Sequence, residues 1–394
     1  MLNRRILRVK AFQNLYAYDQ CKSSNFNLAK DRIKDAFQPD LNSMEVQDKN
    51  LLKKEAAIAT DLFVSNLNND ILDTKDFSQP KIINAVKDAL NFFRQSNTKD
   101  YEFLIKNMVS SAERLPQLYL YAIKLLLAFS DHVAGETARK KKFSGDKVSV
   151  TLGEMNMAKN VLLDKIRHSK EFDAACTRNQ VDLEELELEI KEWFRDYVKP
   201  LEEYQAYIAL STPSADEDFE IADTILKKVI FQNEVILNFF SEKDMNWTEN
   251  KSIVRSLASK VLKNVKSHLD ETGEVLPEIA LNWEEDKEFF QNIFNLTIQN
   301  DDQNRKLIAK KTENWDIERI AQTDKIILSM ALTEMQNFPS IPTKVSINEY
   351  IDISKTYSTP KSKQFVNGLL DVMSKELTDK GLIRKSGRGL LDNK

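Results

Sequence analysis

The chain has 394 residues, a formal net charge of −4, and a composition that is 42% hydrophobic and 30% charged. This balance is typical of a globular protein with a real core and excludes an intrinsically disordered chain. Only 8 glycines occur, none of them before Gly135, which argues against a turn-rich β architecture. Lys and Glu interleaved with Leu, Ile and Ala predict an all-α fold instead.

The cysteine usage and the hydropathy pattern indicate a cytoplasmic protein. Cys21 and Cys176 form neither a disulfide framework nor a metal-ligand spacing, as is usual in a reducing compartment. No segment reaches the ~18 uninterrupted apolar residues that a membrane-spanning helix needs. The basic N-terminus is not followed by the apolar region of a secretory signal. We therefore expect no membrane partner.

Residues 4–20 predict a first helix with an apolar face and a basic start. Its first turns carry cations and no acid. Cations are unfavourable at a helix N-terminus, which already carries a partial positive charge, whereas a phosphate is favourable there. The basic start is either a phosphate-binding surface or only a solubilising one. The apolar face consists of Leu7, Ala11, Leu15 and Tyr18, and the cations are Arg4, Arg5, Arg8 and Lys10.

The middle of the chain, to about Pro277, predicts a series of helices separated by prolines. Leu118–Phe129 is apolar nearly all round and is expected at the centre of a helical core. Phe143–Thr151 interrupts the pattern and predicts an exposed loop. The acidic run Leu183–Leu188 indicates a solvated helix face rather than a partner motif.

An internal similarity relates two stretches of the chain. Asp218 and Asp286 each end an acidic triplet before an apolar helical stripe, and they are 68 residues apart. Trp247 and Trp315 follow those stripes and are also 68 residues apart. Acids at a helix start complement the helix dipole, and a Trp can pack over the start of the next helix. We infer a duplicated helical hairpin at about residues 216–265.

The last hundred residues predict further amphipathic helices. One runs from Trp283 to about Ala309, and another begins after Trp315 and ends before Pro339. Two short helices follow, joined by a turn over Tyr357–Pro360. The tail from Lys380 is glycine-rich and basic, and we expect it to be flexible.

The second short helix contains a glycine within its predicted apolar stripe of Phe365, Leu369 and Val372. Gly368 costs a helix on the order of 1 kcal/mol relative to Ala. Such a residue usually marks a close approach of another backbone. Ser358 or Thr359 is expected to cap this helix.

Patterns that carry catalysis or cofactor binding are missing from the sequence. The three histidines lie in separate segments without ligands at metal-binding spacing. No phosphate-binding glycine motif and no G-x-S-x-G nucleophile motif occur. Asp324 lies alone on an apolar stripe, which is typical of a structural hydrogen-bonded acid. We therefore predict no catalytic residue, no metal and no cofactor, and hence no enzyme.

The remaining motifs resemble the NusB family of bacterial transcription antitermination factors. The segments are Arg4–Ala17, Trp315–Ile320, Ile327–Met335, Ile341-Pro342, Val345–Lys355 and Phe365–Asp371, in the family's order and spacing. The resemblance covers residues 1–22, as the basic first helix of a NusB-like domain, and residues 280–378, as its core. Residues 23–279 then form a large helical insertion, and residues 379–394 a basic flexible tail.

The resemblance implies an all-helical bundle that binds RNA and lacks catalysis. Family members bind the boxA RNA of ribosomal RNA leader transcripts together with the ribosomal protein NusE. That assembly joins the RNA polymerase antitermination complex and promotes read-through. The family's main RNA-contacting element corresponds here to Arg4, Arg5, Arg8 and Lys10, and its weaker RNA-proximal turn corresponds to Lys361, Ser362 and Lys363.

Some points stay open at the level of sequence. Ser329 stands where the family often has Arg, which puts any contact there in doubt. The insertion could extend the RNA surface through Arg139–Lys142, shield the partner surface, or serve only as packing. NusB-like domains also precede rRNA methyltransferase domains, but the glycine-rich cofactor loop and the Pro-Cys dipeptide of those enzymes are missing here. A helical scaffold that binds only protein is the third possibility.

Overall fold

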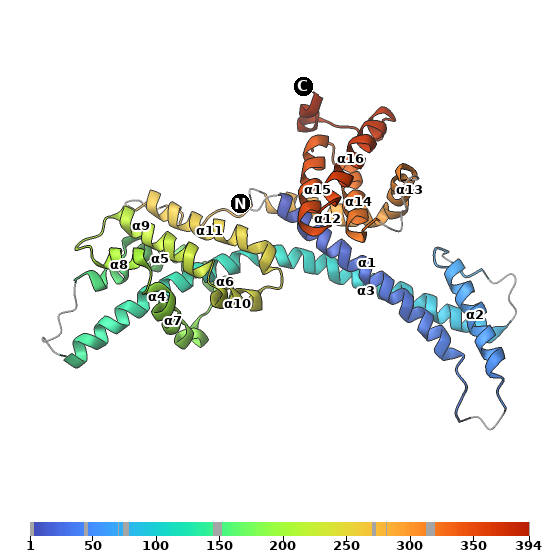
Figure 1. Ribbon diagram of the computed structural model, residues 1–394, viewed down its shortest axis with the longest axis horizontal. Coiled ribbons are helices and arrows are strands. Elements are labelled where there is room, and N and C mark those ends of the chain that lie inside the picture. Colours follow the sequence, from blue (N-terminus) through green and yellow to red (C-terminus); the bar gives the residue numbers. More distant parts are fainter. Residues whose placement is uncertain are drawn as a thin grey trace. The chain divides into compact units, whose positions relative to one another are not determined.

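The structure, a computed structural model, describes residues 4–42, 46–69, 71–73, 79–144, 152–269, 273–280, 282–312 and 320–393 (Figure 1). Throughout these residues the regular structure is helical and no strand occurs, which confirms the predicted all-α fold. The chain divides into two compact units. Unit 1 comprises Met1–Ile6 and Ser110–Asp286, and unit 2 comprises Leu7–Val109 and Lys287–Lys394.

Unit 1 is built from short helices around one long helix, α4. Its elements are α4 (Leu115–Ser144), η2 (Leu152–Met155), η3 (Met157–Lys159), α5 (Val161–Arg167), α6 (Lys170–Arg178), η4 (Glu184–Leu186), α7 (Glu187–Trp193), the π-helical turn η5 (Phe194–Val198), α8 (Glu202–Ile208), α9 (Ala215–Thr224), the π-helical turn η6 (Ile225–Ile230), α10 (Glu234–Lys243) and α11 (Trp247–Ser267).

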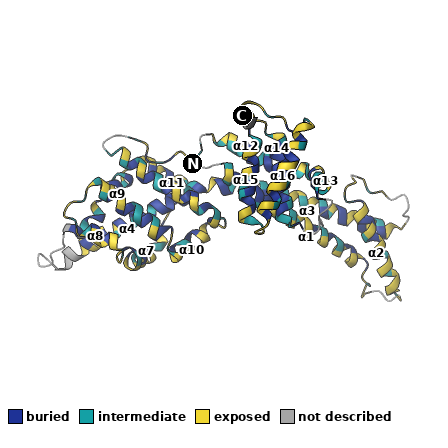
Figure 2. Cartoon of the chain, turned by 45° about the horizontal axis from the view of Figure 1, so that its top comes forward, coloured by how far each residue is buried: buried dark blue, intermediate teal, exposed yellow. Residues whose placement is uncertain are grey.

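Helix α4 forms the centre of unit 1, as its apolar sequence predicts. Leu118, Leu125 and Phe129 are at most 1% exposed, and α5, α6, α7, η6 and α11 all contact this helix. Figure 2 shows buried residues concentrated within each group of helices. Since burial of apolar surface is the main favourable term in folding, α4 is the element on which this unit depends.

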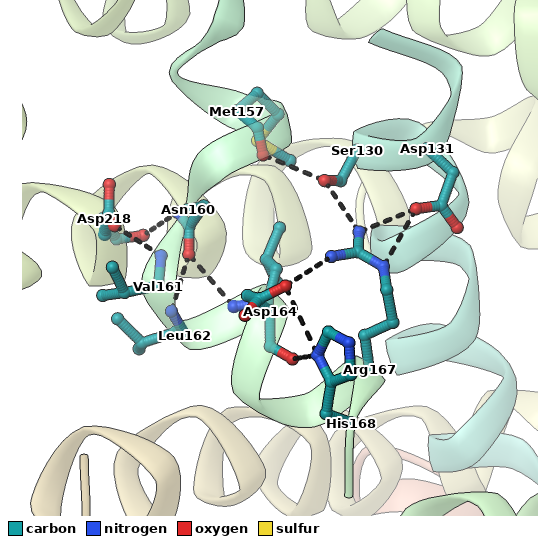
Figure 3. Close-up of polar contacts among 11 residues, drawn as sticks. Ser130, Asp131, Met157, Asn160, Val161, Leu162, Asp164, Arg167, His168 and Asp218 are labelled. Atoms are coloured by element: carbon teal, nitrogen blue, oxygen red, sulfur yellow. Dashed lines mark hydrogen bonds and ion pairs between the residues drawn. The ribbon is translucent and has the colours of Figure 1, made fainter. Parts of the chain in front are cut away.

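Polar side chains fix the start of α5 within unit 1 (Figure 3). Asn160 accepts hydrogen bonds from the backbone N–H groups of Leu162 and Leu163, both at 3.1 Å, and so caps the helix. Its amide donates to the carbonyl of Asp218 at 2.9 Å, and the Asp218 carboxylate accepts from the Val161 N–H at 2.7 Å. Burial raises the pKa of Asp218 above its usual range. The last acid of the first triplet therefore joins α9 to α5.

The helices of the two similar stretches correspond in order. The first stretch contains α9 with η6, then α10 and α11; the second contains α12 (Trp283–Gln299), α13 (Asp301–Lys311) and α14 (Gln322–Asn337). Shifted by 68 residues, α9 and α10 begin within one residue of α12 and α13. The predicted single helix from Trp283 to Ala309 is wrong, because Asn300 separates α12 from α13.

Unit 2 combines a long pair of helices with the C-terminal bundle. Its elements are α1 (Arg4–Ala36), α2 (Lys49–Ser65), α3 (Pro80–Glu113), α12, α13, α14, α15 (Thr343–Tyr357), α16 (Ser362–Asp379) and the short η8 (Gly387–Asn393). Helices α1, α3 and α12 contribute residues to both units. The predicted end of the first helix at residue 20 is wrong: α1 continues to Ala36 and crosses residue 23, the predicted start of the insertion. The domain boundaries stay a prediction.

The reason α1 continues is a second apolar cluster. Ala29, Ile33 and Phe37 are buried against Phe63 of α2 and Phe93 of α3. The Phe63 and Phe93 rings meet edge to face, with centroids 6.1 Å apart. Such pairs stabilise a core beyond simple area burial, so α1, α2 and α3 pack together as a small three-helix group.

The C-terminal bundle is centred on α14, whose residues from Ile326 to Met335 are all buried. Helices α13, α15 and α16 contact it, and α15 contacts α16. The predicted pair of short helices joined by a turn is confirmed and consists of α15 and α16. On α15 the buried side chains include Ile347, Tyr350 and Ile351, which recur at helical spacing.

Helix α16 buries a different face from the predicted one. Val366, Leu370, Met373 and Leu377 are buried, whereas Val372 is 54% exposed and Phe365 and Leu369 are half-buried. A Cβ on Gly368 would meet no atom within 4 Å among the described residues. The prediction that Gly368 admits another backbone of this chain is therefore wrong. Ser358 and Thr359 do not cap the backbone either; the helix begins after Lys361, without a side-chain cap.

The C-terminal tail packs against the bundle, and its flexibility stays a prediction. Ile383 is buried, the Lys385 ammonium donates to the Phe338 carbonyl at 3.0 Å, and the Ser386 N–H donates to the Pro339 carbonyl at 3.0 Å. The predicted loop at Phe143–Thr151 begins inside α4, and its residues 145–151 lie outside the described ranges. Trp315 and the rest of that motif up to residue 319 also lie outside them.

Candidate nucleic-acid interface

The predicted basic residues of α1 divide between surface and interior. Arg4 is about one-third exposed and forms ion pairs with Glu285 and with Asp286, the latter at 3.6 Å. Arg5 is exposed. Arg8 and Lys10 are 3% and 2% exposed and belong to the interior. Only the first two cations are therefore placed where an RNA phosphate could approach.

Arg8 is held by a buried carboxylate on α14. Its Nε and a terminal nitrogen donate to the two oxygens of Glu334 at 2.7 Å and 2.8 Å, and its guanidinium carbon lies 5.2 Å from the centre of the Phe289 ring. Glu334 is fully buried and also accepts from Ser346 at 2.7 Å and Tyr350 at 3.0 Å. This bidentate geometry joins α1, α14 and α15 into one polar centre.

The protonation behaviour of this centre follows from its burial and its ion pair. Burial works to lower the pKa of Arg8, but the hydrogen bond and the charge of Glu334 outweigh it and raise the pKa above its ordinary value. Burial, together with the Glu334 charge, raises the pKa of Tyr350 well above its usual range. Arg8 therefore stays cationic and Tyr350 stays neutral, which suits a structural role.

The second predicted site lies at the turn before α16. Lys361 and Lys363 are exposed, whereas Ser362 between them is 2% exposed. The Ser362 hydroxyl donates to the Asp324 carboxylate at 2.7 Å and contacts the hydroxyls of Ser358 and Thr359 at 3.0 Å and 2.8 Å. Ser362 thus anchors the turn to α14 and leaves two lysine side chains at the surface.

One feature of the sequence points to the buried Arg8–Glu334 pair, although helical periodicity does not identify it. Glu334 stands in a helix whose residues from Ile326 to Met335 are otherwise mostly apolar, and a charge at such a position needs a partner. Its partner Arg8 is 326 residues away in the chain, so no local pattern could identify it. Asp324 is structural and hydrogen-bonded, as its lone position on the stripe indicates.

Two observations concern other kinds of site. None of the described helices has the length and hydropathy needed to cross a bilayer. Within the same described residues, no three His, Cys, Asp or Glu side chains are grouped as metal ligands would be.

Comparison with known proteins shows which family contains this bundle. The family model of the NusB family matches residues 218–375. The transcription antitermination protein NusB of Chloroherpeton thalassium is 41% identical over 143 residues, which cover 35% of this chain and 68% of that protein. The chain belongs to the NusB family.

Two further NusB proteins support the assignment. That of Salinibacter ruber is 42% identical over 105 residues, or 27% of this chain and 66% of the relative; that of Koribacter versatilis is 39% identical over 94 residues, or 24% and 64%. The matches thus span about two thirds of each NusB relative. No solved structure matches. The family match begins within α9, upstream of residue 280, so it takes in the first of the two similar stretches as well as the second.

Proposed function

We propose that this protein is a non-catalytic, RNA-binding transcription antitermination factor of the cytoplasm. It binds boxA-type RNA of ribosomal RNA leader transcripts together with NusE and promotes read-through by RNA polymerase. The observation that carries the proposal is the 41% identity to a protein named transcription antitermination protein NusB. The exposed cations at Arg5, Lys361 and Lys363 supply side chains that can meet phosphate oxygens.

The buried members of the predicted site take a positioning role in this proposal. Arg8 and Lys10 lie inside the bundle, and Ser362 fixes the turn to Asp324. We therefore assign RNA contact to Arg4, Arg5, Lys361 and Lys363. For Arg4, an RNA phosphate competes with the carboxylates of Glu285 and Asp286. The burial of Arg8 and Lys10 favours one second candidate, a scaffold of the NusB fold that binds only protein.

Titration of labelled boxA RNA and of a scrambled RNA, at two salt concentrations and with or without NusE, tests the proposal. We expect boxA RNA to bind more tightly than the scrambled RNA when NusE is present. Neutralising Lys361 and Lys363 to Gln should weaken binding to every sequence. It should also flatten the salt slope by about 0.7 for each RNA phosphate that the variant no longer neutralises.

The matched control is Lys54→Gln on α2, an exposed lysine of the same unit that lies outside the predicted sites. It should leave both affinity and salt slope unchanged. Equal affinity for boxA and scrambled RNA in the presence of NusE would contradict antitermination. Binding of NusE, with no measurable binding of either RNA, would support the protein-only scaffold instead.

A further inference from the structure

A small cavity lies inside unit 2 between α1, the end of α12, α13 and α14. Its volume is about 60 Å³, and apolar side chains such as Leu15 and Ile326 form part of its wall. The charged residues of the lining are Asp19, Lys22, Asp301, Arg305 and Lys325, and hydroxyl-bearing residues are Tyr18, Thr297 and Ser329. A water molecule needs roughly 10–15 Å³ of such space, so the cavity has room for a group of several heavy atoms.

The charges around this cavity leave a positive surplus. Arg305 donates through Nε to Asp301 at 2.8 Å and lies 3.4 Å from Asp19, so this cation offsets the acids. Asp19 also accepts from Gln322 at 2.9 Å. Burial opposes ionisation of Arg305, but the hydrogen bond and charge of Asp301 raise its pKa. Among the described residues, Lys22 and Lys325 have no acidic partner.

Ser329, another residue of the lining, has a buried hydroxyl without a partner among the described residues. Ser329 is 4% exposed, and its Oγ has no hydrogen-bond partner within the described part of the chain. Buried polar groups in native proteins are nearly always satisfied, and each exception calls for a specific cause such as local strain or a bound water or ion. A lining that contains this serine and two lysines suits a ligand that presents acceptor oxygens and negative charge.

The first of the two similar stretches provides an internal comparison for this cavity. At the offset of 68 residues, Lys325 and Ser329 correspond to Leu257 and Val261 of α11. Both of those side chains are fully buried in the apolar core of unit 1. A helix in this position therefore packs well with apolar residues, and α14 instead carries an ammonium and a hydroxyl. Packing alone does not account for the polar pair.

We propose that this cavity binds one phosphate group, through the ammonium groups of Lys22 and Lys325 and the hydroxyl of Ser329. Two sources share this chemistry: free inorganic phosphate, and a backbone phosphate of bound RNA. The second source rests on the proposed function. In either case the ligand neutralises the surplus charge and satisfies the buried hydroxyl.

Calorimetric titration of the full-length protein with inorganic phosphate tests the site. Chloride serves as the reference anion, and the ionic strength is kept constant. The wild type should show saturable binding of one phosphate. Lys22→Met combined with Lys325→Met should weaken it at least tenfold, and Ser329→Ala by a few-fold. Lys306→Met on α13, an exposed lysine outside the cavity, is the matched control and should bind as the wild type does.

Circular dichroism of each variant in chloride verifies that its fold is intact. The site is refuted if the wild type shows no saturable binding, or if the double lysine variant binds phosphate as tightly as the wild type does.

Titrating the same variants with RNA separates the two sources. A fall in RNA affinity in parallel with phosphate affinity, with a salt slope flattened by about 0.7 per phosphate, identifies a backbone phosphate. Unchanged RNA affinity together with abolished phosphate affinity identifies a site for free phosphate. If the wild type binds phosphate but no RNA, the proposed function fails and the phosphate site stands.

Discussion

Arg8 and Glu334 show how one pair of residues decides whether a basic helix faces solvent or the core. Both side chains are almost completely buried, and their two hydrogen bonds are supplemented by Ser346 and Tyr350. Removing two charges from water is costly, and their attraction offsets that cost only with good geometry and satisfied hydrogen bonds. Removal of one partner therefore leaves an uncompensated buried charge.

Arg8→Met should lower the free energy of unfolding by about 3–5 kcal/mol, because Glu334 remains buried without its cation. Adding Glu334→Gln should restore much of that stability. Lys34→Met on the same helix removes an exposed ion pair to Asp31 and should cost at most about 1 kcal/mol. Urea denaturation of the variants measures the three changes. An Arg8→Met variant as stable as Lys34→Met would show that the buried guanidinium does not stabilise the folded protein.

Helix α16 presents two unlike faces, and its glycine lies on the outer one. The inner face, which includes Val366 and Leu370, packs in the bundle, while Gly368 and Val372 are exposed. A glycine in an exposed helix interior weakens the helix by its backbone entropy, with no compensating contact inside this chain. The stability of α16 is therefore open to improvement at that position.

Gly368→Ala should raise the free energy of unfolding by about 0.5–1 kcal/mol, since the new Cβ meets open space. Gly135→Ala on α4 is the matched control, because a Cβ there also meets nothing within 4 Å. Thermal unfolding of both variants should show similar increases in midpoint. A decrease for Gly368→Ala alone would contradict the open space around this position.

Across the whole molecule, local patterns predicted the elements better than they predicted the contacts between distant elements. The apolar run Leu118–Phe129 and the α15–α16 turn were predicted correctly, because each depends on spacing within one segment. The interior place of Arg8 was missed, because it depends on an acid near the other end of the chain. The cavity was missed for the same reason, since Lys22 and Lys325 come from helices far apart in sequence.

Each of the two units has a buried core of its own, and this predicts how the molecule unfolds. Leu126 of α4 and Leu328 of α14 are both fully buried. Truncation of a buried leucine to alanine costs about 2–5 kcal/mol, because apolar burial is reduced and a cavity remains. Proteins with more than one core commonly depart from two-state unfolding. Leu126→Ala should therefore destabilise unit 1, and Leu328→Ala unit 2.

Differential scanning calorimetry should resolve two transitions in the wild type. Leu126→Ala is expected to lower the midpoint of one transition, and Leu328→Ala that of the other. Leu188→Ala, at a side chain that is 72% exposed, is the control and should move neither. A single transition that both core variants lower equally would contradict separate unfolding. The phosphate titration then assigns the transitions, because a ligand that binds only the folded cavity raises the midpoint of unit 2.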